Sequence, residues 1–390
     1  MARSIDDVSH MLVQAKQNDE DVHLLTQIFY YPSEIKCSEN KENFKLMQID
    51  EELIKKLESG ERLIFKGSND EKVVLCTENE TYEVKEGEIS NSLLVCPNLL
   101  FGSDVKNSEK NERTLTEQKI FGVQHSYLEF RPTFPRFGKL KSILSQANYS
   151  GPDNDEESHK GFYFCELLDN VQCSRSELLA QLEEIKAIKL EDKWRLLSLD
   201  YLVEIFSHLM SEMEKNNWTK IHVLECKKNL DLFVPDVILE HVFKHYSKNY
   251  VKDQIWLELD EYLISRCFAQ VLLQTAEGKF SFDEFIMAWE NCLSPVIKPN
   301  LNYLKGLALI DNESELNKVI HLFLEEDLPE NIPERFRLLF KNKEKWTLEE
   351  ITPYIQKLTT KTANVNSLLT KFARCTNVKG LKVFTAKYAK

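Results

Sequence analysis

The stretch that decides the fold is Lys345–Ile351, KWTLEEI, because its pattern occurs twice more along the chain. Lys279–Phe285, KFSFDEF, has the same order of basic, aromatic, hydroxyl and acidic residues, and Cys173–Leu178, CSRSEL, is a fainter copy. Each contains Ser/Thr-x-x-Glu, the capping box in which a hydroxyl and a carboxylate bind the free amides at a helix start. The three pairs are Ser174/Glu177, Ser281/Glu284 and Thr347/Glu350. The pattern predicts a repeated helical module.

The last copy is the clearest. Apolar spacing predicts helices over Glu334–Asn342, Leu348–Leu358 and Asn364–Arg374, followed by a strand over Leu381–Thr385. Three helices and then a β wing are the order of a winged helix-turn-helix. We therefore expect a winged-helix domain over residues 329–390.

The other two copies predict two more winged-helix domains. Residues 259–328 carry one copy, and residues 161–258 carry the other, with two or three helices over 200–258 that the pattern does not place. Residues 172–200 have five basic and six acidic residues, which would repel phosphate as much as attract it. A protein partner is the better expectation for that domain.

Residues 1–130 have a different pattern, with short β-rich runs between polar turns. Examples are Arg62–Lys66, Lys72–Thr77, Thr81–Lys85 and Ser92–Cys96. Such runs predict an antiparallel sheet or a barrel-like domain. Its edges stay open unless it closes on itself or pairs with another subunit. We expect a subunit-docking domain; a barrel closed within the chain is the alternative.

Residues 131–160 are expected to link the two parts. Arg131–Lys141 has four basic residues, two phenylalanines and no acid, and Gly151–Ser158 is acidic. The prolines favour a stiff extended connector, although basic residues between aromatic ones also suit single-stranded nucleic acid. The expected fold is therefore an α+β multidomain protein, with an N-terminal antiparallel β-barrel-like domain followed by tandem winged-helix domains.

Charge is distributed unevenly. The chain has a net charge of −13, but residues 341–390 have eleven basic and three acidic residues, a net +8, which leaves −21 on the other 340 residues. A basic end on an acidic body can dock on phosphate. A solvated lysine-rich tail is the alternative.

The winged-helix prediction gives this basic end a DNA-binding surface. The third helix of such a domain can enter the major groove while the wing contacts the backbone. The expected phosphate-binding residues are Lys371 and Arg374 on the helix, and Lys379, Lys382 and Lys387 along the wing. No cluster of Asn, Gln and Arg at the helix start indicates base reading, so we expect sequence-independent binding of single- and double-stranded DNA.

The sequence indicates no catalytic, cofactor or metal site. It lacks GxxxxGK[ST], GxGxxG and GxSxG motifs. His241 and His245 are four residues apart, but Val242 stands where a zinc peptidase has glutamate, so a helix surface or core edge is expected. The nine cysteines form no CxxC pair, and no apolar run reaches the ~18 residues of a membrane helix. We expect an intracellular protein that is not an enzyme and has no membrane contact.

Short motifs resemble the Dcc-type sister chromatid cohesion subunit, in order, over nearly the whole chain. They are Val73–Thr77, Thr81–Lys85, Ser90–Leu94, Tyr149-x-Gly151-Pro152, Leu304–Leu309, Asp327–Pro329, Glu334–Phe336, Glu344–Thr347 and Pro353–Gln356. The resemblance implies a noncatalytic subunit of the alternative, cohesion-specific replication factor C, which loads or unloads the clamp PCNA at replication forks in the nucleus.

In that family, β-barrel structure forms with a small partner subunit and the tail of the large ATPase subunit. The assembly tethers the loader to the catalytic subunit of DNA polymerase epsilon, and winged helices bind DNA. ATP hydrolysis belongs to other subunits, which agrees with the missing phosphate loop. The alternative from a different class is a stand-alone winged-helix transcription or chromatin factor, which would read bases and need no partner for residues 1–130.

Overall fold

The computed structural model describes residues 10, 13–14, 25–30, 45–69, 71–101, 114–154, 161–276, 278–312, 318–359, 364–378 and 380–387. The chain forms two units. The first comprises Met1–Thr77 and Tyr82–Thr133, and the second comprises Glu78–Thr81 and Phe134–Lys390. The first is β-rich and the second combines helices with small sheets, so the fold is mixed α+β, as expected.

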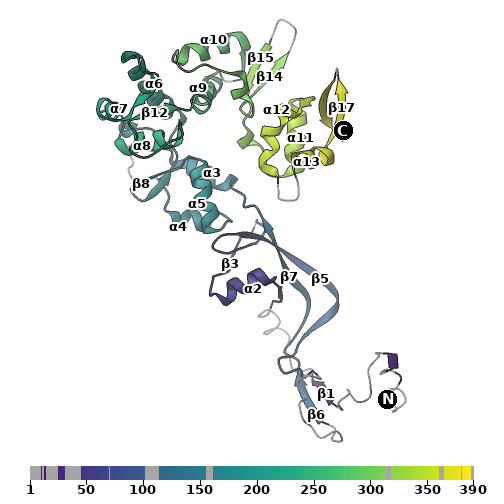
Figure 1. Ribbon diagram of the computed structural model, residues 1–390. Helices are drawn as coiled ribbons and strands as arrows, with labels where there is room; N and C mark the ends of the chain where they lie inside the picture. Colours follow the sequence, from purple (N-terminus) through teal and green to yellow (C-terminus); the bar gives the residue numbers. More distant parts are fainter. Residues whose placement is uncertain are drawn as a thin grey trace. The chain divides into compact units, whose positions relative to one another are not determined.

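The first unit is built on a curled sheet whose two long strands are clear in Figure 1. The strand order is β2-β7-β5-β4-β3. These strands are β2 (Met47–Gln48), β3 (Ile64–Lys66), β4 (Val74–Cys76), β5 (Thr81–Val95) and β7 (Gly122–Thr133). β3 and β4 are antiparallel, but β2 is parallel to β7, and β1 (Leu25–Tyr30) is parallel to β6 (Thr114–Lys119). The expectation of a wholly antiparallel arrangement was therefore wrong.

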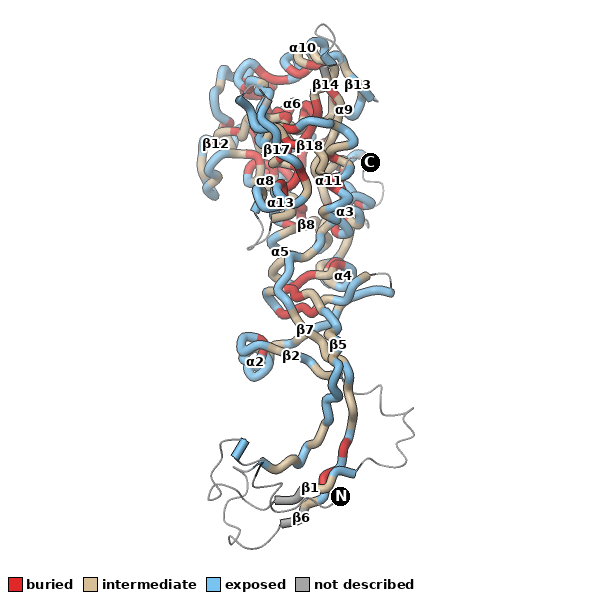
Figure 2. Tube along the Cα trace, turned by 90° about the vertical axis from the view of Figure 1, so that its right-hand side faces the viewer, coloured by how far each residue is buried: buried red, intermediate tan, exposed pale blue. Residues whose placement is uncertain are grey.

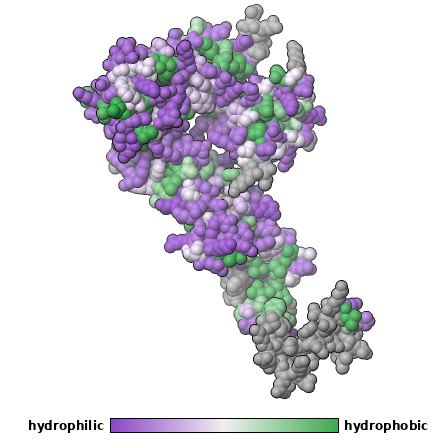
Figure 3. Space-filling view, in the orientation of Figure 1, coloured by the Kyte–Doolittle hydropathy of each residue, from purple (hydrophilic) through white to green (hydrophobic). Residues whose placement is uncertain are grey.

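The first unit buries few apolar side chains. Helix α2 (Glu51–Glu58) begins at Asp50, whose carboxylate accepts the Leu53 N–H at 2.9 Å, and α2 packs Leu53 against Leu75 and Tyr82. Figure 2 shows mostly half-buried and exposed residues along β5 and β7. Figure 3 shows hydrophobic side chains gathered on these strands. Burial of one large apolar side chain contributes only about 1.5–3 kcal/mol. The cluster of Leu53, Leu75 and Tyr82 is therefore a small core for strands of this length.

The second unit repeats one order of elements four times within the described residues: helix, strand, helix, helix, strand, strand. Module 1 (138–197) contains α3 (Gly138–Leu144), α4 (Phe164–Asn170), α5 (Arg175–Glu184), β8 (Ile188–Leu190) and β9 (Lys193–Arg195). Module 2 (199–259) contains α6 (Leu199–Lys215), β10 (Ile221–His222), α7 (Val223–Leu230), α8 (Asp236–His245), β11 (Ser247–Lys248) and β12 (Trp256–Leu259).

Modules 3 and 4 complete the series. Module 3 (261–324) contains α9 (Glu261–Thr275), β13 (Lys279–Ser281), α10 (Phe282–Cys292), η5 (Leu301–Leu304), β14 (Ala308–Asn312) and β15 (Lys318–Leu322). Module 4 (332–387) contains α11 (Ile332–Asn342), β16 (Trp346–Thr347), α12 (Leu348–Ile355), η7 (Gln356–Leu358), α13 (Val365–Phe372), β17 (Ala373–Val378) and β18 (Leu381–Ala386).

The sheets of these modules share one topology. Modules 2, 3 and 4 have the orders β10-β12-β11, β13-β15-β14 and β16-β18-β17, so the last strand always lies between the other two. In module 1 the first strand is reduced to Phe162, which exchanges backbone hydrogen bonds with Trp194 of β9. Residues 200–258, which the sequence pattern did not place, therefore form a further copy of the same module.

Two local expectations differ from the structure. Residues 138–147 are helical, with Leu140 and Leu144 buried, so the extended connector expected over Arg131–Lys141 was wrong for its last four residues. The spacing of these leucines explains it, because residues four apart share one helix face. The capping boxes form at Ser174/Glu177 and Thr347/Glu350, but the Ser281 hydroxyl makes no cap and the residue ends β13 paired with Val319.

Apolar packing joins consecutive modules. One cluster contains Tyr149 and Ile188 of module 1, most of the core of module 2, and module 3 residues such as Trp289. The module 4 cluster contains Leu309, which belongs to β14 of module 3. Gly306 adapts the chain to this junction, because its φ is +76° and an added Cβ would lie 2.9 Å from the Pro353 side chain.

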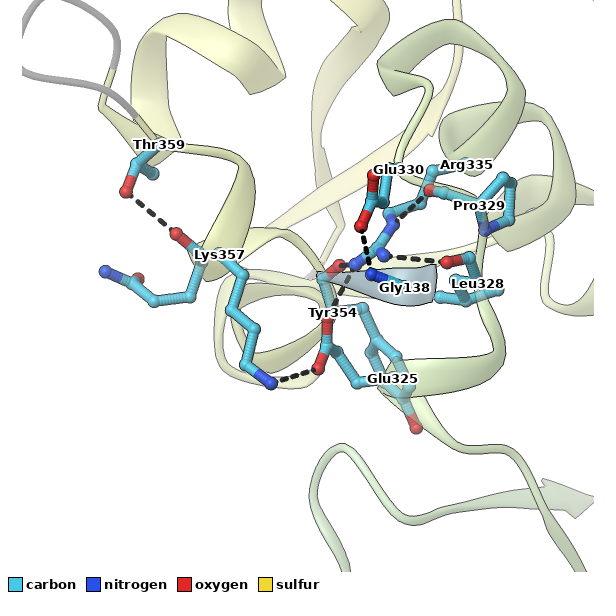
Figure 4. A network of polar contacts seen from close by, with 10 residues as sticks. Gly138, Glu325, Leu328, Pro329, Glu330, Arg335, Tyr354, Lys357 and Thr359 are labelled. Atoms are coloured by element: carbon cyan, nitrogen blue, oxygen red, sulfur yellow. Dashed lines mark hydrogen bonds and ion pairs between the residues drawn. The ribbon is translucent and has the colours of Figure 1, made fainter. Parts of the chain in front are cut away.

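A buried arginine fixes the segment between modules 3 and 4 to module 4. Arg335 on α11 is only 4% exposed. Its guanidinium donates to Glu325 Oε1 (2.7 Å) and to the carbonyl oxygens of Leu328 (2.8 Å), Pro329 (2.7 Å) and Tyr354 (2.8 Å) (Figure 4). Glu325 Oε2 in turn pairs with Lys357 at 3.0 Å. A guanidinium is always charged in proteins, so it is buried only where its donors are satisfied.

The Arg335→Met variant should destabilise module 4 by about 3 kcal/mol, because three carbonyls lose the arginine donor and the largely buried Glu325 carboxylate keeps only its pair with Lys357. Hydrogen exchange of a peptide covering 332–342 measures this change locally. Arg337→Met, an exposed arginine on the same helix, should change the free energy of opening by less than about 0.5 kcal/mol. Equal exchange in the two variants would contradict the anchoring role of Arg335.

His241 links modules 1 and 2. Its Nε2 lies 3.0 Å from the Lys186 carbonyl oxygen, and Lys244 and His245 of the same helix contact Glu183. Burial, and then the neighbouring His245, lower the pKa of His241 from 6.5 to about 4. The unfolded chain therefore binds more protons at this residue between these two values, and stability is lost as the pH falls from 6.5 towards 4.

Wild-type protein should lose about 2 kcal/mol more unfolding free energy than His241→Gln when the pH is lowered from 7.5 to 5. Urea titrations at the two pH values measure the difference. His208→Gln, at a half-buried histidine on α6, is the control and should keep the wild-type pH dependence. If His241→Gln also keeps it, His241 is not the group responsible.

Candidate nucleic-acid and subunit interfaces

The predicted DNA-binding residues lie at the end of module 4. Asn364 caps α13 by accepting the Ser367 N–H at 2.9 Å, and Leu368 and Leu369 bury one face of the helix. The helix then ends at Phe372, and the chain continues directly into β17. The helix and the β17–β18 hairpin are thus held side by side by one small core.

Lys371 and Lys387 lie close together. Lys371 is exposed, with its ammonium 5.3 Å from the centre of the Phe372 ring. The Lys387 ammonium donates to the carbonyl oxygens of Thr370 (3.0 Å) and Lys371 (3.2 Å). These are the free carbonyls of the last helical turn, where a cation is favoured by the helix dipole. Lys387 therefore caps α13 as well as carrying charge.

Arg374 and Lys382 lie on opposite faces of the hairpin. Arg374 pairs in register with Thr385, and Lys382 pairs with Asn377. Side chains alternate along a strand, so Lys382 shares its face with buried Phe384, whereas Arg374 is on the other face. Both residues are exposed. Lys379 lies outside the described residues.

Two other cations of the basic end are paired with acids in the described part of the chain. Lys343 lies 2.8 Å from Glu350, and Lys357 lies 3.0 Å from Glu325. Burial raises the pKa of Glu350, but hydrogen bonds from Lys343 and Thr347 outweigh this and leave the pKa below 4.5. The net charge counted from the sequence is therefore larger than the positive charge available to a ligand. Lys371, Arg374 and Lys382 are among the exposed cations that carry it.

The first unit presents a second candidate interface, which is apolar. Of the described residues, β2 pairs only with Leu128 and Glu129 of the twelve-residue strand β7, and β4 has three residues against fifteen in β5. Long stretches of strand edge therefore have no neighbouring strand in the described part of the chain. Exposed large side chains accompany them: Met47 (45%), Ile64 (49%), Phe65 (47%), Leu93 (39%), Leu94 (42%) and Phe121 (52%).

A shallow groove lies on this sheet. It has a volume of about 360 Å³ and is lined by Leu46, Met47, Gln48, Leu93 and Tyr127. Exposed apolar surface of this kind, beside open strand edges, is typical of a place where another chain adds a strand. The individual β-runs were visible in the sequence, whereas the exposure of Leu93 and Leu94 was not.

The described residues contain no group of three or more His, Cys, Asp or Glu side chains arranged to hold a metal ion. His241 and His245 have ring centres 4.4 Å apart, and the Nε2 atom of His241 is hydrogen-bonded to the Lys186 carbonyl oxygen. Among the helices described, none has the length and apolar character needed to cross a membrane.

Comparison with known proteins agrees with the motif resemblance. The family model of sister chromatid cohesion protein Dcc1 matches residues 44–355. Sister chromatid cohesion protein DCC1 of Mus musculus is 35% identical over 351 residues, 88% of this chain and 87% of that protein. The DCC1 proteins of Danio rerio (33% identity, 99% of this chain and 98% of that protein) and Saccharomyces cerevisiae (24%, 85% and 93%) also match. The resemblance is therefore confirmed, and the chain belongs to the Dcc1 family of sister chromatid cohesion proteins.

Proposed function

We propose that this chain acts in sister chromatid cohesion as a noncatalytic subunit of an alternative replication factor C. In this role it supports loading or unloading of PCNA at replication forks in the nucleus, while ATP hydrolysis resides in other subunits. Family membership supports the cohesion role, since the relatives carry that name. The absence of nucleotide-binding motifs from the sequence is consistent with a chain that depends on an ATPase partner.

The observation that carries this proposal is the unfinished sheet of the first unit. Its strand edges are open over most of β5 and β7, its apolar cluster is small, and Leu93 and Leu94 are exposed. Strands from the large ATPase subunit and from the small barrel subunit would pair with these edges and cover the apolar side chains. The first unit is then a docking domain that completes a barrel only within the complex.

The second unit supplies the other contacts. The order helix, strand, helix, helix and hairpin, with the last strand central, supports a tandem array of winged-helix modules. In module 4, α13 would approach DNA while the β17–β18 wing contacts phosphate through Arg374 and Lys382, without reading sequence. Module 1, whose residues 172–197 have five basic and five acidic side chains, would contact the catalytic subunit of DNA polymerase epsilon, and PCNA would be reached only through other subunits.

The second candidate is a stand-alone winged-helix transcription or chromatin factor. The repeated modules favour it as much as they favour the loader subunit. The exposed apolar sheet of the first unit does not, because a protein working alone would leave that surface in water. Base-specific DNA binding without partner subunits would support this alternative.

Replacing both Leu93 and Leu94 with Asp should abolish capture of clamp-loader subunits by the tagged chain, because charge would be buried against the added strands. Affinity purification from nuclear extract followed by quantitative mass spectrometry measures the loss, expected to exceed about tenfold. Leu232→Asp, at a leucine that is 91% exposed in module 2, is the control and should retain the partners. Retention by the Leu93/Leu94 variant would reject the docking surface.

Replacing Lys371 and Arg374 with Glu should weaken DNA binding and lower the slope of log affinity against log salt by about 2, since two phosphate contacts are lost. Fluorescence anisotropy with unrelated duplex and single-stranded sequences measures both quantities. Lys228→Glu with Lys252→Glu makes the same charge change at exposed lysines of module 2 and should leave the slope unchanged. An equal fall in both double variants would indicate a general charge effect instead of a site.

A further inference from the structure

The junction between modules 1 and 4 differs chemically from the junctions between consecutive modules. Those three all include apolar packing, besides polar contacts such as His241 with Lys186: Ile188 of module 1 packs in the module 2 core, core residues of α6 and α9 belong to one cluster across modules 2 and 3, and Leu309 of module 3 is buried in module 4. The module 1 cluster around Leu140 and Leu144 contains no residue of module 4 among the described residues. What holds these two modules together is polar.

Two of the described contacts on helix α3 cross this junction. Glu330 Oε1 accepts the Gly138 N–H at 2.9 Å, and the Lys141 ammonium pairs with the Glu326 carboxylate. Figure 4 shows Gly138 beside Glu330, next to the Arg335 network. The Lys141 and Glu326 side chains are 41% and 40% exposed, so water and ions reach the pair.

The two acidic residues in these contacts, Glu326 and Glu330, lie in a segment that is bound to module 4. The segment 325–330, EEDLPE, is fixed by Arg335, which binds Glu325, Leu328 and Pro329. Glu326 and Glu330 project from this anchored segment. They are therefore fixed to module 4, and in the described part of the chain α3 of module 1 meets their carboxylates.

We propose that Glu326 and Glu330 form an electrostatic latch that closes module 4 on module 1 and opens as ionic strength rises. Exposed ion pairs are weak and are screened by salt, whereas the apolar junctions of the array are not. A contact of this strength leaves open and closed forms close in free energy, so modest changes in conditions shift their populations. The latch decides whether the basic last module is tied to module 1 directly or is connected to it only through modules 2 and 3.

Hydrogen exchange of the full-length chain at 0.05 M and 0.5 M NaCl tests the latch. In the wild type, peptides covering 134–144 and 325–332 should exchange roughly fivefold faster at the higher salt, while a peptide from buried helix α6 should not change. Lys141→Glu should exchange fast at both salt concentrations. Combining it with Glu326→Lys recreates the pair with reversed charge and should restore slow, salt-sensitive exchange.

A matched control distinguishes the latch from general charge effects. Lys248→Glu breaks an exposed pair with Glu258 (2.9 Å) inside module 2 and should leave both peptides at wild-type rates. Thermal melts identify any variant that simply unfolds, in which case Glu330→Ala, which removes one acceptor, replaces it. Wild-type exchange in both Lys141→Glu and Glu330→Ala, or fast exchange in the charge-swapped pair, would overturn the proposal.

Discussion

The need to satisfy a buried guanidinium governs how the last module is attached. Arg335 cannot lose its charge, so the chain around it must supply acceptors. Three of the four come from residues 325–329, which connect modules 3 and 4, and the fourth comes from α12. The path of the connecting segment, the position of η6 (Glu325–Asp327) and the direction in which Glu326 and Glu330 point all follow from this requirement.

The two units differ in how they bury apolar side chains. In the second unit, apolar side chains of consecutive modules pack together. Large side chains such as Trp289 and Trp346 are fully buried, and their indole N–H groups donate to backbone carbonyls. The first unit has long strands, a small apolar cluster and exposed leucines. The second unit thus closes its cores with its own modules, whereas the first unit leaves apolar side chains exposed on its strands.

Much of the helical part could be predicted from sequence, because α11, α12 and α10 follow apolar spacing and Thr347 supplies a true cap. Module 2 could not, since its first strand is only Ile221–His222 and no Ser/Thr-x-x-Glu motif marks its start. The identities of the terminal cations were visible, but their arrangement was not. That Arg374 and Lys382 lie on opposite faces depends on the β17–β18 register, and β17 itself overlaps the predicted helix end.

The position of Leu309 has a consequence for how this chain tolerates truncation. The residue belongs to β14 but is only 4% exposed because module 4 covers it, together with partly buried Phe323. A chain ending before α11 would keep module 3 yet present both side chains to water. Such a truncated chain would have a newly exposed apolar surface and would be recognised by chaperones and proteases. Loss of the last module is thus coupled to removal of the truncated polypeptide.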